Sequence, residues 1–382
     1  MKILFVLSRV PWPLEKGDKL RAFQLIRELS KQHDVLLFCL SDQNIHTKAE
    51  TMLKSMCSEV YIHRFSRMDI VLNLTKGLFN RLPFQVNYFY SKKAADAFDR
   101  YLEKHLPQHI FCQLIRTAEY VRKYTLIPKS IDYMDALSSG MDRASQHTGW
   151  PVNIPMMWET KRLKEYEKDI QSDFLHRYII SEQDRNQLSY VEDLHVVPNG
   201  ISEEFLVQKQ VSAYKCDILF TGNMAYRPNV ECAKFLAMRV MPLVWEKRPE
   251  ATLYISGATP SKAVLALASD RVKVTGWIDD IAEMYRSSKV FAAPMSIGSG
   301  LQNKLLEAMA CGVACITSNL ANNALMAVDG ESVLIANDAE SVSVSILRLL
   351  ENEELRSRIG EAGRAFVTSQ YSWQKAASLL SF

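Results

Sequence analysis

The strongest candidate for chemistry in the sequence is a predicted helix start that follows a loop containing two glycines. Gly298 and Gly300 precede this helix, and Lys304 and Glu307 lie three residues apart on it, so they share one side. Glycine lets a backbone approach a ligand closely, and the free amides of a helix start attract an anion. An ammonium adds charge for a diphosphate, and a carboxylate can accept hydrogen bonds from a ribose diol. The pattern favours ligand binding over the alternative, a surface ion pair between Lys304 and Glu307.

The same helix has a pattern that would pack one of its sides against a sheet. Leu301, Leu305 and Ala308 form an apolar stripe. Asn303 lies four residues before Glu307, on the side that carries the polar groups. One side is therefore expected to pack while the other presents an amide, an ammonium and a carboxylate.

The segment GSGLQNKLLEAMACGVACITS (298–318) resembles the donor-binding signature of glycosyltransferase family 4. Four further segments occur where that family would have them: PNGI (198–201), FTGNMAYRPNVE (220–231), VTGWIDDIAEMYRSSKVFAAP (274–294) and YSW (371–373). Within the family the chain most resembles bacterial sugar transferases of exopolysaccharide gene clusters, including those associated with exosortase systems. The resemblance implies a GT-B fold, a nucleotide-sugar donor and retention of anomeric configuration.

The resemblance also implies a role for each polar group of the helix. Glu307 matches the second glutamate of the family's E-x7-E pattern, which holds the ribose hydroxyls, and Lys304 with the helix start meets the diphosphate. Ser299 stands where the family has the first glutamate, so backbone amides are expected to replace that contact. The expected donor-binding residues of this segment are Ser299, Gly300, Leu301, Gln302, Asn303, Lys304 and Glu307.

Two other loops complete the donor site that the resemblance implies. Gly276 and Trp277 lie where the family's backbone reads the nucleobase. Gly222 and Asn223 follow an apolar run, but Asn223 stands where family members often carry an arginine. Arg227 is the nearby cation, and it either replaces that charge at the phosphates or is a solvated loop residue.

The first half of the chain contains two weaker candidates. Lys16, Gly17 and Asp18 form a loop that starts a helix, where Gly17 either allows close approach of acceptor or phosphate, or belongs to a plain strand-to-helix turn. Asp132 and Asp135 lie at the end of an apolar run. A carboxylate at the carboxyl end of a strand either accepts the acceptor's proton or orients the donor sugar, and Asp135 is the candidate for this role. The competing interpretation makes Asp135 a helix N-cap. His195 is expected to be a packed core residue.

The elements that position these residues follow from short apolar runs that alternate with longer amphipathic segments. This pattern predicts an α/β protein with two doubly wound Rossmann-like domains that face each other across a cleft. We expect an N-terminal acceptor-side domain over 1–197 and a C-terminal donor-binding domain over 198–366. A C-terminal helix within 367–382 is expected to return to the first domain.

Composition excludes several classes of protein. A net charge of +3 is too small to predict a nucleic-acid partner, and seven cysteines, mostly in apolar runs, are typical of buried thiols in a reducing compartment. No apolar run is long enough to span a bilayer, so a cytoplasmic enzyme is expected. Residues 64–93 mix six cations with bulky apolar side chains. They are either an ordinary helix and loop, or a peripheral contact with the inner face of the plasma membrane or a lipid-linked acceptor.

These features predict transfer of a sugar from a nucleotide-sugar donor to a glycan or lipid-linked acceptor, with Asp135, Lys304 and Glu307 as the catalytic residues. No Asp-x-Asp motif is present, so neither a metal nor a cofactor is expected. Two alternatives remain, namely a catalytically silent nucleotide-sugar-binding partner and a nucleotide-sugar epimerase of GT-B type. The sequence does not identify the donor base, the sugar, the acceptor, the linkage or the oligomeric state.

Overall fold

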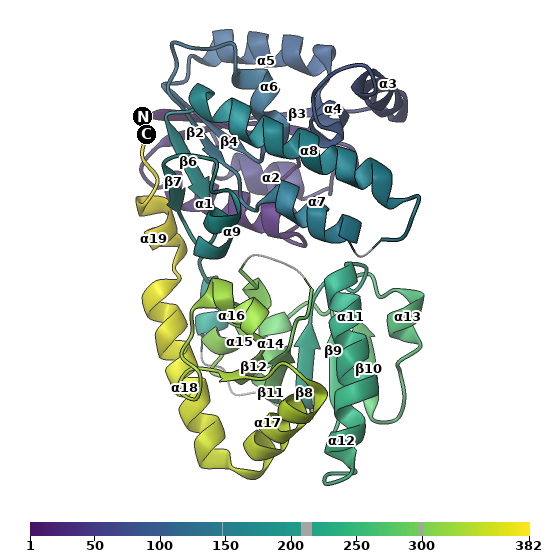
Figure 1. The fold of residues 1–382 in the computed structure, drawn as a ribbon. Coiled ribbons are helices and arrows are strands. Elements are labelled where there is room, and N and C mark those ends of the chain that lie inside the picture. The colour runs from purple at the N-terminus through teal and green to yellow at the C-terminus, as the bar shows by residue number, and fades with distance from the viewer. Residues whose placement is uncertain (147, 208–215, 298–300) are drawn as a thin grey trace. The chain divides into compact units, whose positions relative to one another are not determined.

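The computed structural model describes residues 1–146, 148–207, 216–297 and 301–382. The chain divides into two units, one comprising Met1–Pro198 with Gln374–Phe382 and the other comprising Asn199–Trp373. Each unit consists of a parallel sheet with helices around it (Figure 1). Ser299 and Gly300, two of the predicted donor-binding residues, lie outside the described residues.

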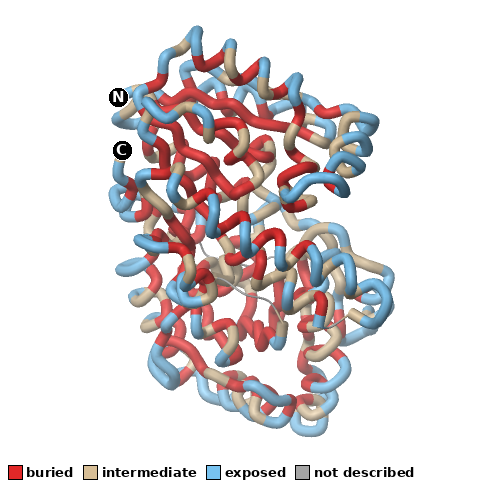
Figure 2. The backbone as a smooth tube through the Cα atoms, turned by 45° about the horizontal axis from the view of Figure 1, so that its top comes forward, coloured by how far each residue is buried: buried red, intermediate tan, exposed pale blue. Residues whose placement is uncertain are grey.

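The first unit is built on a seven-stranded parallel sheet in the order β3-β2-β1-β4-β5-β6-β7. Its strands are β1 (Lys2–Leu7), β2 (Asp34–Ser41), β3 (Glu59–Arg64), β4 (His109–Gln113), β5 (Lys129–Asp132), β6 (His176–Ile179) and β7 (Leu194–Val196). The central strands are continuous apolar runs because both faces of the sheet are covered, and in Figure 2 they appear in red. Strand β3 was not predicted, since its apolar run covers only residues 60–62 and no residue of the strand is fully buried.

The helices of the first unit connect these strands in chain order. They are α1 (Gly17–Leu29), α2 (Ala49–Lys54), α3 (Arg67–Gly77), α4 (Phe84–Phe89), α5 (Lys92–His105), α6 (Ala118–Val121), α7 (Leu137–Gln146), α8 (Asn153–Asp169) and α9 (Glu182–Gln187), and the last helix of the chain is α19 (Trp373–Ser378). The chain end packs on this unit: the Ser381 amide donates to the Tyr178 hydroxyl at 2.8 Å, and the Phe382 ring lies 5.1 Å from the His109 ring.

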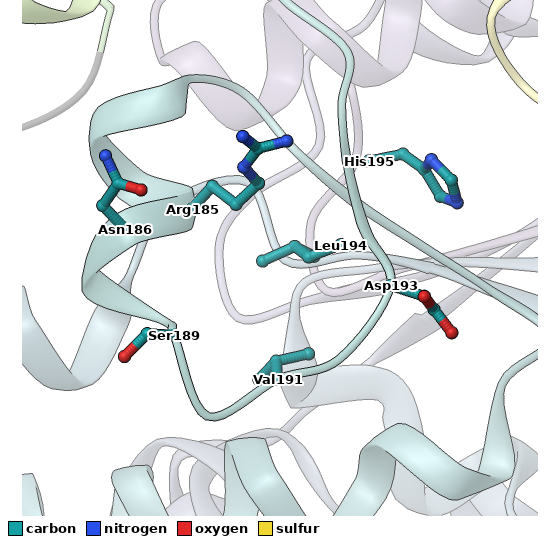
Figure 3. Close-up of a pocket in the computed structure, with 7 residues that line it drawn as sticks. All are labelled: Arg185, Asn186, Ser189, Val191, Asp193, Leu194 and His195. Atoms are coloured by element: carbon teal, nitrogen blue, oxygen red, sulfur yellow. The ribbon is translucent and has the colours of Figure 1, made fainter.

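The prediction that His195 is a packed core residue is wrong. His195 is exposed on β7, the edge strand of the sheet, where one side of the strand faces solvent. It lines a pocket of about 450 Å³ with Arg185, Asn186, Ser189, Val191, Asp193 and Leu194. Figure 3 shows the side chains of Arg185 and His195 directed apart rather than toward one point. No residue of the predicted site lines this pocket.

The second unit is built on a six-stranded parallel sheet in the order β10-β9-β8-β11-β12-β13. Its strands are β8 (Cys216–Thr221), β9 (Leu253–Ser256), β10 (Val272–Gly276), β11 (Ser288–Ala293), β12 (Ala314–Thr317) and β13 (Leu334–Ile335). Its helices are α10 (Glu203–Leu206), α11 (Arg227–Phe235), α12 (Met241–Trp245), α13 (Lys262–Leu265), α14 (Ile281–Arg286), α15 (Asn303–Ala310), α16 (Asn319–Leu325), α17 (Ala339–Glu351) and α18 (Glu353–Gln370), with a π-helical turn at Leu236–Val240.

Both sheets follow the Rossmann strand order. Successive strands are added on one side of the first strand and then, from the fourth strand on, on its other side, so the strand order reverses beside the first strand. The predicted α/β class with two doubly wound units is therefore confirmed. In the second unit the reversal lies between β8 and β11. In open α/β sheets ligands bind beyond the carboxyl ends of the strands at such a reversal. The loops that follow β8 and β11 carry Gly222, Asn223 and the start of α15.

Candidate functional site

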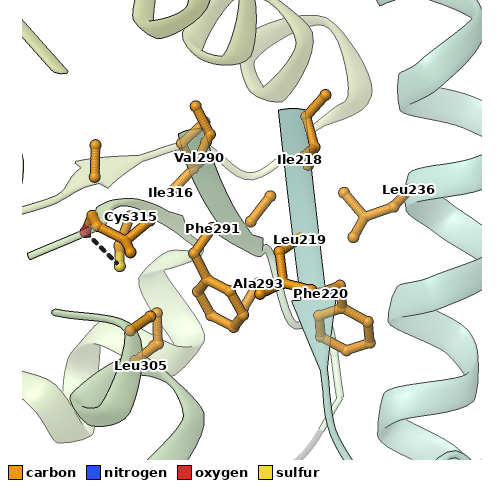
Figure 4. Close-up of a cluster of buried hydrophobic side chains, with 14 of the residues drawn as sticks. Ile218, Leu219, Phe220, Leu236, Val290, Phe291, Ala293, Leu305, Cys315 and Ile316 are labelled. Atoms are coloured by element: carbon orange, nitrogen blue, oxygen red, sulfur yellow. Dashed lines mark hydrogen bonds between the residues drawn. The ribbon is translucent and has the colours of Figure 1, made fainter. Parts of the chain in front are cut away.

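Helix α15 places its two ionisable side chains on one side because its other side is buried. Leu305 and Ala308 are buried against the sheet, as the apolar stripe predicted, and Leu301 is half-buried. Figure 4 shows Leu305 directed toward the buried side chains of β11 and β12. The N-cap of α15, Gln302, has extended backbone, and its own side chain makes no capping hydrogen bond. Lys304 and Glu307 are therefore fixed in direction by the packing of their neighbours.

Lys304 is a half-buried ammonium that is held by neutral groups. Its Nζ donates to Oδ1 of Asn229 and lies 4.9 Å from the centre of the Phe220 ring. Burial lowers the pKa of Lys304 to about 8, although Glu307 acts in the opposite direction. Because its hydrogen-bond partner is a neutral amide, this partly desolvated ammonium would be strongly stabilised by an anionic ligand.

Glu307 lies in a hydrogen-bonded chain rather than in an ion pair. Its Oε2 accepts a hydrogen bond from the Tyr285 hydroxyl at 2.9 Å, and that hydroxyl lies 2.6 Å from Oγ1 of Thr221. Burial raises the pKa of Glu307 to about 7, against the effect of the Tyr285 hydrogen bond. The described residues contain no ion pair between Lys304 and Glu307, so the surface-pair alternative is wrong. Tyr285 is fully buried, and its role was not predicted because it resembles any core aromatic residue.

Asn229 connects Lys304 to the loop that follows β8. Its Nδ2 donates to the backbone oxygen of Asn223 at 2.9 Å, while its Oδ1 accepts from Lys304. The backbone of Gly222 has φ of +154°, and a Cβ there would lie 2.6 Å from Nδ2 of Asn229. Sequence reasoning did not single out Asn229, although it lies two residues after Arg227 in the segment that carried the resemblance. The loop and the ammonium are thus one hydrogen-bonded assembly.

Close backbone contact at the ends of β8, β9 and β10 forms the adjoining edge of the site. Gly257 has φ of +138°, and a Cβ there would lie 1.9 Å from the backbone oxygen of Gly222. The Gly257 amide donates to the oxygen of Gly276 at 2.8 Å. Trp277, which follows Gly276, is 62% exposed and donates from Nε1 to Asp279 at 2.9 Å. At Gly222 and Gly257 only a residue without a side chain fits, which leaves the backbone there open to a flat ligand.

The remaining predicted donor residues have distinct positions. Asn303 accepts a hydrogen bond at its Oδ1 from the Asn199 amide at 3.0 Å, which ties the PNG turn to the start of α15. Asn223 accepts at its Oδ1 from the amide of Ala225 and the hydroxyl of Thr259. Arg227 is exposed at the first position of α11. Its contact with phosphate remains a prediction.

The first unit contains the other candidates, at the carboxyl ends of its own strands. Lys16 is the N-cap of α1, Gly17 is its first residue, and a Cβ at Gly17 would meet no heavy atom within 4 Å. Asp18 pairs with Arg9 at 2.5 Å and accepts at its backbone oxygen from Gln113. Residues on both sides of this loop line a pocket of about 380 Å³, whose polar and aromatic lining includes Arg9, Trp12, Glu15, Lys19, Asp42 and His46.

Asp135 does not cap a helix, so that alternative is wrong. Helix α7 begins two residues later, at Leu137, and the amide of Ser138 donates to Oε1 of Glu167 at 3.1 Å. Burial, together with the nearby carboxylates of Asp184 and Asp132, raises the pKa of Asp135 to about 7. Asp135 is half-buried, which is compatible with proton exchange near neutral pH.

A buried ion pair that sequence reasoning missed supports this end of the sheet. Nε of Arg21 contacts Oδ2 of Asp132 at 2.5 Å, and both side chains are fully buried. Nη1 of Arg21 also donates to the backbone oxygen of Val197 at 2.8 Å. The pair fixes α1 against the ends of β5 and β7. The sequence singled out Asp132 at the end of an apolar run, but it did not indicate the partner, because an arginine in the first turns of an amphipathic helix is usual on a solvated face.

Two further observations concern metals and membranes. Among the described residues, no group of three or more His, Cys, Asp and Glu side chains is placed to hold a metal ion. Within the same residues, no helix is long and apolar enough to cross a bilayer. The expectation of a metal-independent site remains a prediction.

The second unit also carries the match to a known family. Residues 215–352 match the family model described as Glycosyl transferases group 1. An uncharacterized 44.6 kDa protein in the cps region of Klebsiella pneumoniae is 22% identical over 398 residues, covering 99% of this chain and 98% of that protein. O-antigen chain mannosyltransferase B of Escherichia coli is 29% identical over 184 residues, but the match covers only 45% of this chain and 46% of that protein.

Solved structures match the whole chain at low sequence identity. Sucrose-phosphate synthase from Thermosynechococcus elongatus has a TM-score of 0.70 at 16% identity, covering 99% of this chain and 97% of that one. Anabaena HepE in complex with UDP and glucose has a TM-score of 0.69 at 12% identity, covering 99% and 98%. At such identities the likeness establishes the fold, and the donor of either protein does not carry over.

Proposed function

We propose that this chain, a GT-B glycosyltransferase, moves a sugar from a nucleotide-sugar donor to a glycan or lipid-linked acceptor. The product would be a cell-surface polysaccharide or glycolipid. The observation that carries the proposal is the assembly of Lys304, Asn229, Glu307 and Tyr285 at the strand reversal of the second unit. The relatives named as a mannosyltransferase and as a cps-region protein support the class of product.

In the proposed donor site, different residues bind the diphosphate, the ribose and the base of the nucleotide. Lys304 and the amides at the start of α15 would hold the diphosphate, where negative charge grows as the sugar–phosphate bond breaks. Glu307 would accept hydrogen bonds from the ribose hydroxyls, with Tyr285 fixing the direction of its carboxylate. The glycine edge beside Gly257 and Gly276 would accommodate the base.

The proposed acceptor site lies in the first unit. The 380 Å³ pocket offers the indole of Trp12 as an apolar surface for a sugar ring, and Asp42 and His46 as hydrogen-bonding groups. Asp135, whose pKa is raised to about 7, would receive the acceptor's proton or orient the donor sugar. We propose retention of configuration with attack from the side of the leaving group. We also propose that the reaction needs no divalent cation, since Lys304 and the helix amides would stabilise the leaving group.

A transfer assay tests the proposal. Purified protein is incubated with GDP-mannose, UDP-glucose and other nucleotide sugars, with and without EDTA, and with lipid-linked and free glycan acceptors. We expect one donor to be consumed only when an acceptor is present, to give a product with the donor's anomeric configuration by NMR. We expect Lys304→Ala and Glu307→Ala to lower the rate by a hundredfold or more, on the order of the ~2.7–4 kcal/mol lost with an oxyanion-type contact. The variant Glu231→Gln, on the exposed surface of α11, serves as the control.

Three results would contradict the proposal. Full activity in both variants would remove Lys304 and Glu307 from the site. Binding of a donor without transfer to any acceptor would favour a catalytically silent partner. Formation of an epimer from the donor alone would favour an epimerase.

A further inference from the structure

One end of the first unit exposes an unusual number of large apolar side chains. Helix α3 contains five apolar side chains in 11 residues, yet Gly77 is its only buried residue. Phe79, directly after α3, is 87% exposed. The exposed apolar residues of this segment are Met68, Val71, Leu72, Leu78 and Phe79. In Figure 2 the tube along α3 is mostly pale blue and tan. A helix normally buries its apolar side. Ile70 of α3 packs on the core of the unit, whereas the five exposed residues named above are left in contact with solvent.

The first half of α8 and the residues before it expose a second apolar set. Trp150 is 82% exposed, and the set also includes Val152, Ile154, Met157 and Trp158. Exposed tryptophan is costly in water and is enriched where one end of the ring is apolar and the other is wet. Two such sets in one unit exceed the scattered apolar residues of an ordinary surface.

Contacts join α8 to the end of α3 and to the residues that follow it, and the two exposed sets together are here called the α3–α8 face (residues 67–82 and 150–164). The Trp158 ring lies 5.3 Å from the Phe84 ring, and the Arg162 guanidinium lies over both rings at 4.7 and 4.9 Å. Nη2 of Arg162 donates to the backbone oxygen of Gly77 at 2.9 Å. Glu159 accepts from the amides of Phe84 and Gln85 at 2.8 and 3.0 Å. The face is therefore held in one shape by buried polar contacts.

The charges around this face have one dominant sign. Between residues 67 and 82 and between residues 150 and 164, the exposed cations are Arg67, Lys76, Arg81, Lys161 and Lys164. The acidic residues of these two ranges are Asp69 and Glu159. Asp69 is engaged by the N-cap Ser66, and Glu159 is buried against backbone amides. The charge at this face is thus strongly positive, although the whole chain has a net charge of only +3.

We propose that the α3–α8 face docks on an anionic lipid bilayer. Exposed Phe, Trp and Leu side chains enter the boundary between headgroups and acyl chains, while lysine and arginine around them contact anionic headgroups. A protein partner of ordinary composition would not need cations beside the apolar residues. An anionic bilayer binds both, because its acyl chains accept the apolar side chains and its headgroups attract the cations. This inference goes beyond the transfer reaction, because it does not depend on how donor or acceptor is bound.

Vesicle sedimentation tests the proposal with the full chain. We expect the protein to sediment with vesicles of phosphatidylcholine and phosphatidylglycerol in equal parts, and to stay in the supernatant with phosphatidylcholine alone or when salt is raised. We expect the triple variant Leu72→Ser, Phe79→Ser, Trp150→Ser to lower the bound fraction at least tenfold. The charge variant Arg67→Gln, Lys76→Gln, Arg81→Gln should reduce it similarly. The matched control is Leu126→Ser, Leu175→Ser, which removes two exposed apolar side chains elsewhere on the same unit.

The outcomes separate this proposal from the proposed function. All the substituted side chains are exposed, so thermal midpoints should stay unchanged, and any stabilisation by nucleotide should persist in every variant. Failure of the wild-type chain to bind anionic vesicles overturns the proposal. Binding of the triple variant equal to that of the wild type overturns it too, and so does a loss of binding in the control as large as the loss in the triple variant. Failure to bind vesicles combined with self-association that the triple variant abolishes would show that the face binds protein instead. Loss of transferase activity alone would bear only on the proposed function.

Discussion

At the scale of single residues, the candidate site consists of ionisable groups held away from their usual pKa values. Burial lowers the pKa of Lys304 to about 8 and raises that of Glu307 to about 7. Both pKa shifts show that burial disfavours the charged form of the side chain. A ligand that offers an anion to Lys304 and hydrogen-bond donors to Glu307 would offset this cost of desolvation. Such shifts in a polar assembly are typical of binding and catalytic sites. The spacing of Lys304 and Glu307 indicated this pair, but spacing could not reveal Asn229 or Tyr285, which act through tertiary contacts.

Donor affinity should depend on the ionisation of Glu307. The carboxylate accepts ribose hydroxyls best when charged, so binding lowers its pKa, and affinity should fall as the pH drops through about 7. We expect the dissociation constant of the nucleotide to rise up to about tenfold per pH unit below that point. Calorimetric titration between about pH 8 and about pH 5.5 measures it. The variant Glu307→Gln should bind weakly with a flatter profile, and an unchanged slope in that variant would show that another group titrates.

The same carboxyl group should reduce the stability of the free protein above neutral pH. Its pKa is about 7 in the folded chain against an ordinary value of 4.5, so the folded state holds a proton that the unfolded state has lost. Stability from this group therefore falls as the pH rises from 4.5 to about 7 and stays low above it. We expect Glu307→Gln, which keeps an acceptor for Tyr285, to be more stable by about 1–3 kcal/mol at about pH 8 and equal at low pH. Denaturation of both proteins at the two pH values checks this, and a less stable variant at the higher pH would contradict it.

At the scale of elements, the strand ends and the first turns of helices position the site. The apolar runs predicted most strands of both sheets, because strands covered on both faces are continuously apolar. They missed β3, an edge strand with one partly open face, and they misjudged His195 on the opposite edge, where burial of alternate positions is incomplete. The start of α15 was predicted from the Gly-x-Gly loop and the apolar stripe. The hydrogen bond from Asn199 to Asn303, which joins segments far apart in sequence, had no local signal.

The closeness of the backbones after β8 and β9 gives a prediction for Gly257. A Cβ at this position would lie 1.9 Å from the Gly222 oxygen, so alanine would clash there. The φ of +138° is also a backbone conformation that alanine rarely adopts. We expect Gly257→Ala to destabilise the protein by about 2–4 kcal/mol and to weaken nucleotide binding. The control is Gly17→Ala, where a Cβ meets nothing within 4 Å at the first position of α1. Equal thermal midpoints for the two variants would show that the loop relaxes.

At the scale of the whole molecule, the sequence predicted two Rossmann-like units because two series of alternating strands and helices follow each other along the chain. The strand order could not be read from those runs, since the pairing of β8 with β11 joins strands about seventy residues apart. The order is what brings the Gly222 loop and the start of α15 to one place. The division of the chain, with Gln374–Phe382 belonging to the first unit, likewise depends on contacts such as that between Tyr178 and Ser381.

The central claim is that the group formed by Lys304, Asn229, Glu307 and Tyr285 binds a nucleoside diphosphate. Calorimetric titration of the wild-type chain with UDP, GDP, ADP and TDP tests it most directly. We expect one of them to bind, and we expect Lys304→Gln, Glu307→Gln and Asn229→Asp each to weaken binding about tenfold or more, the last because its carboxylate would compete with the diphosphate for Lys304. Glu231→Gln should bind as the wild type does. Undiminished binding in all three site variants, or no binding of any nucleoside diphosphate to the wild-type chain, would contradict the account.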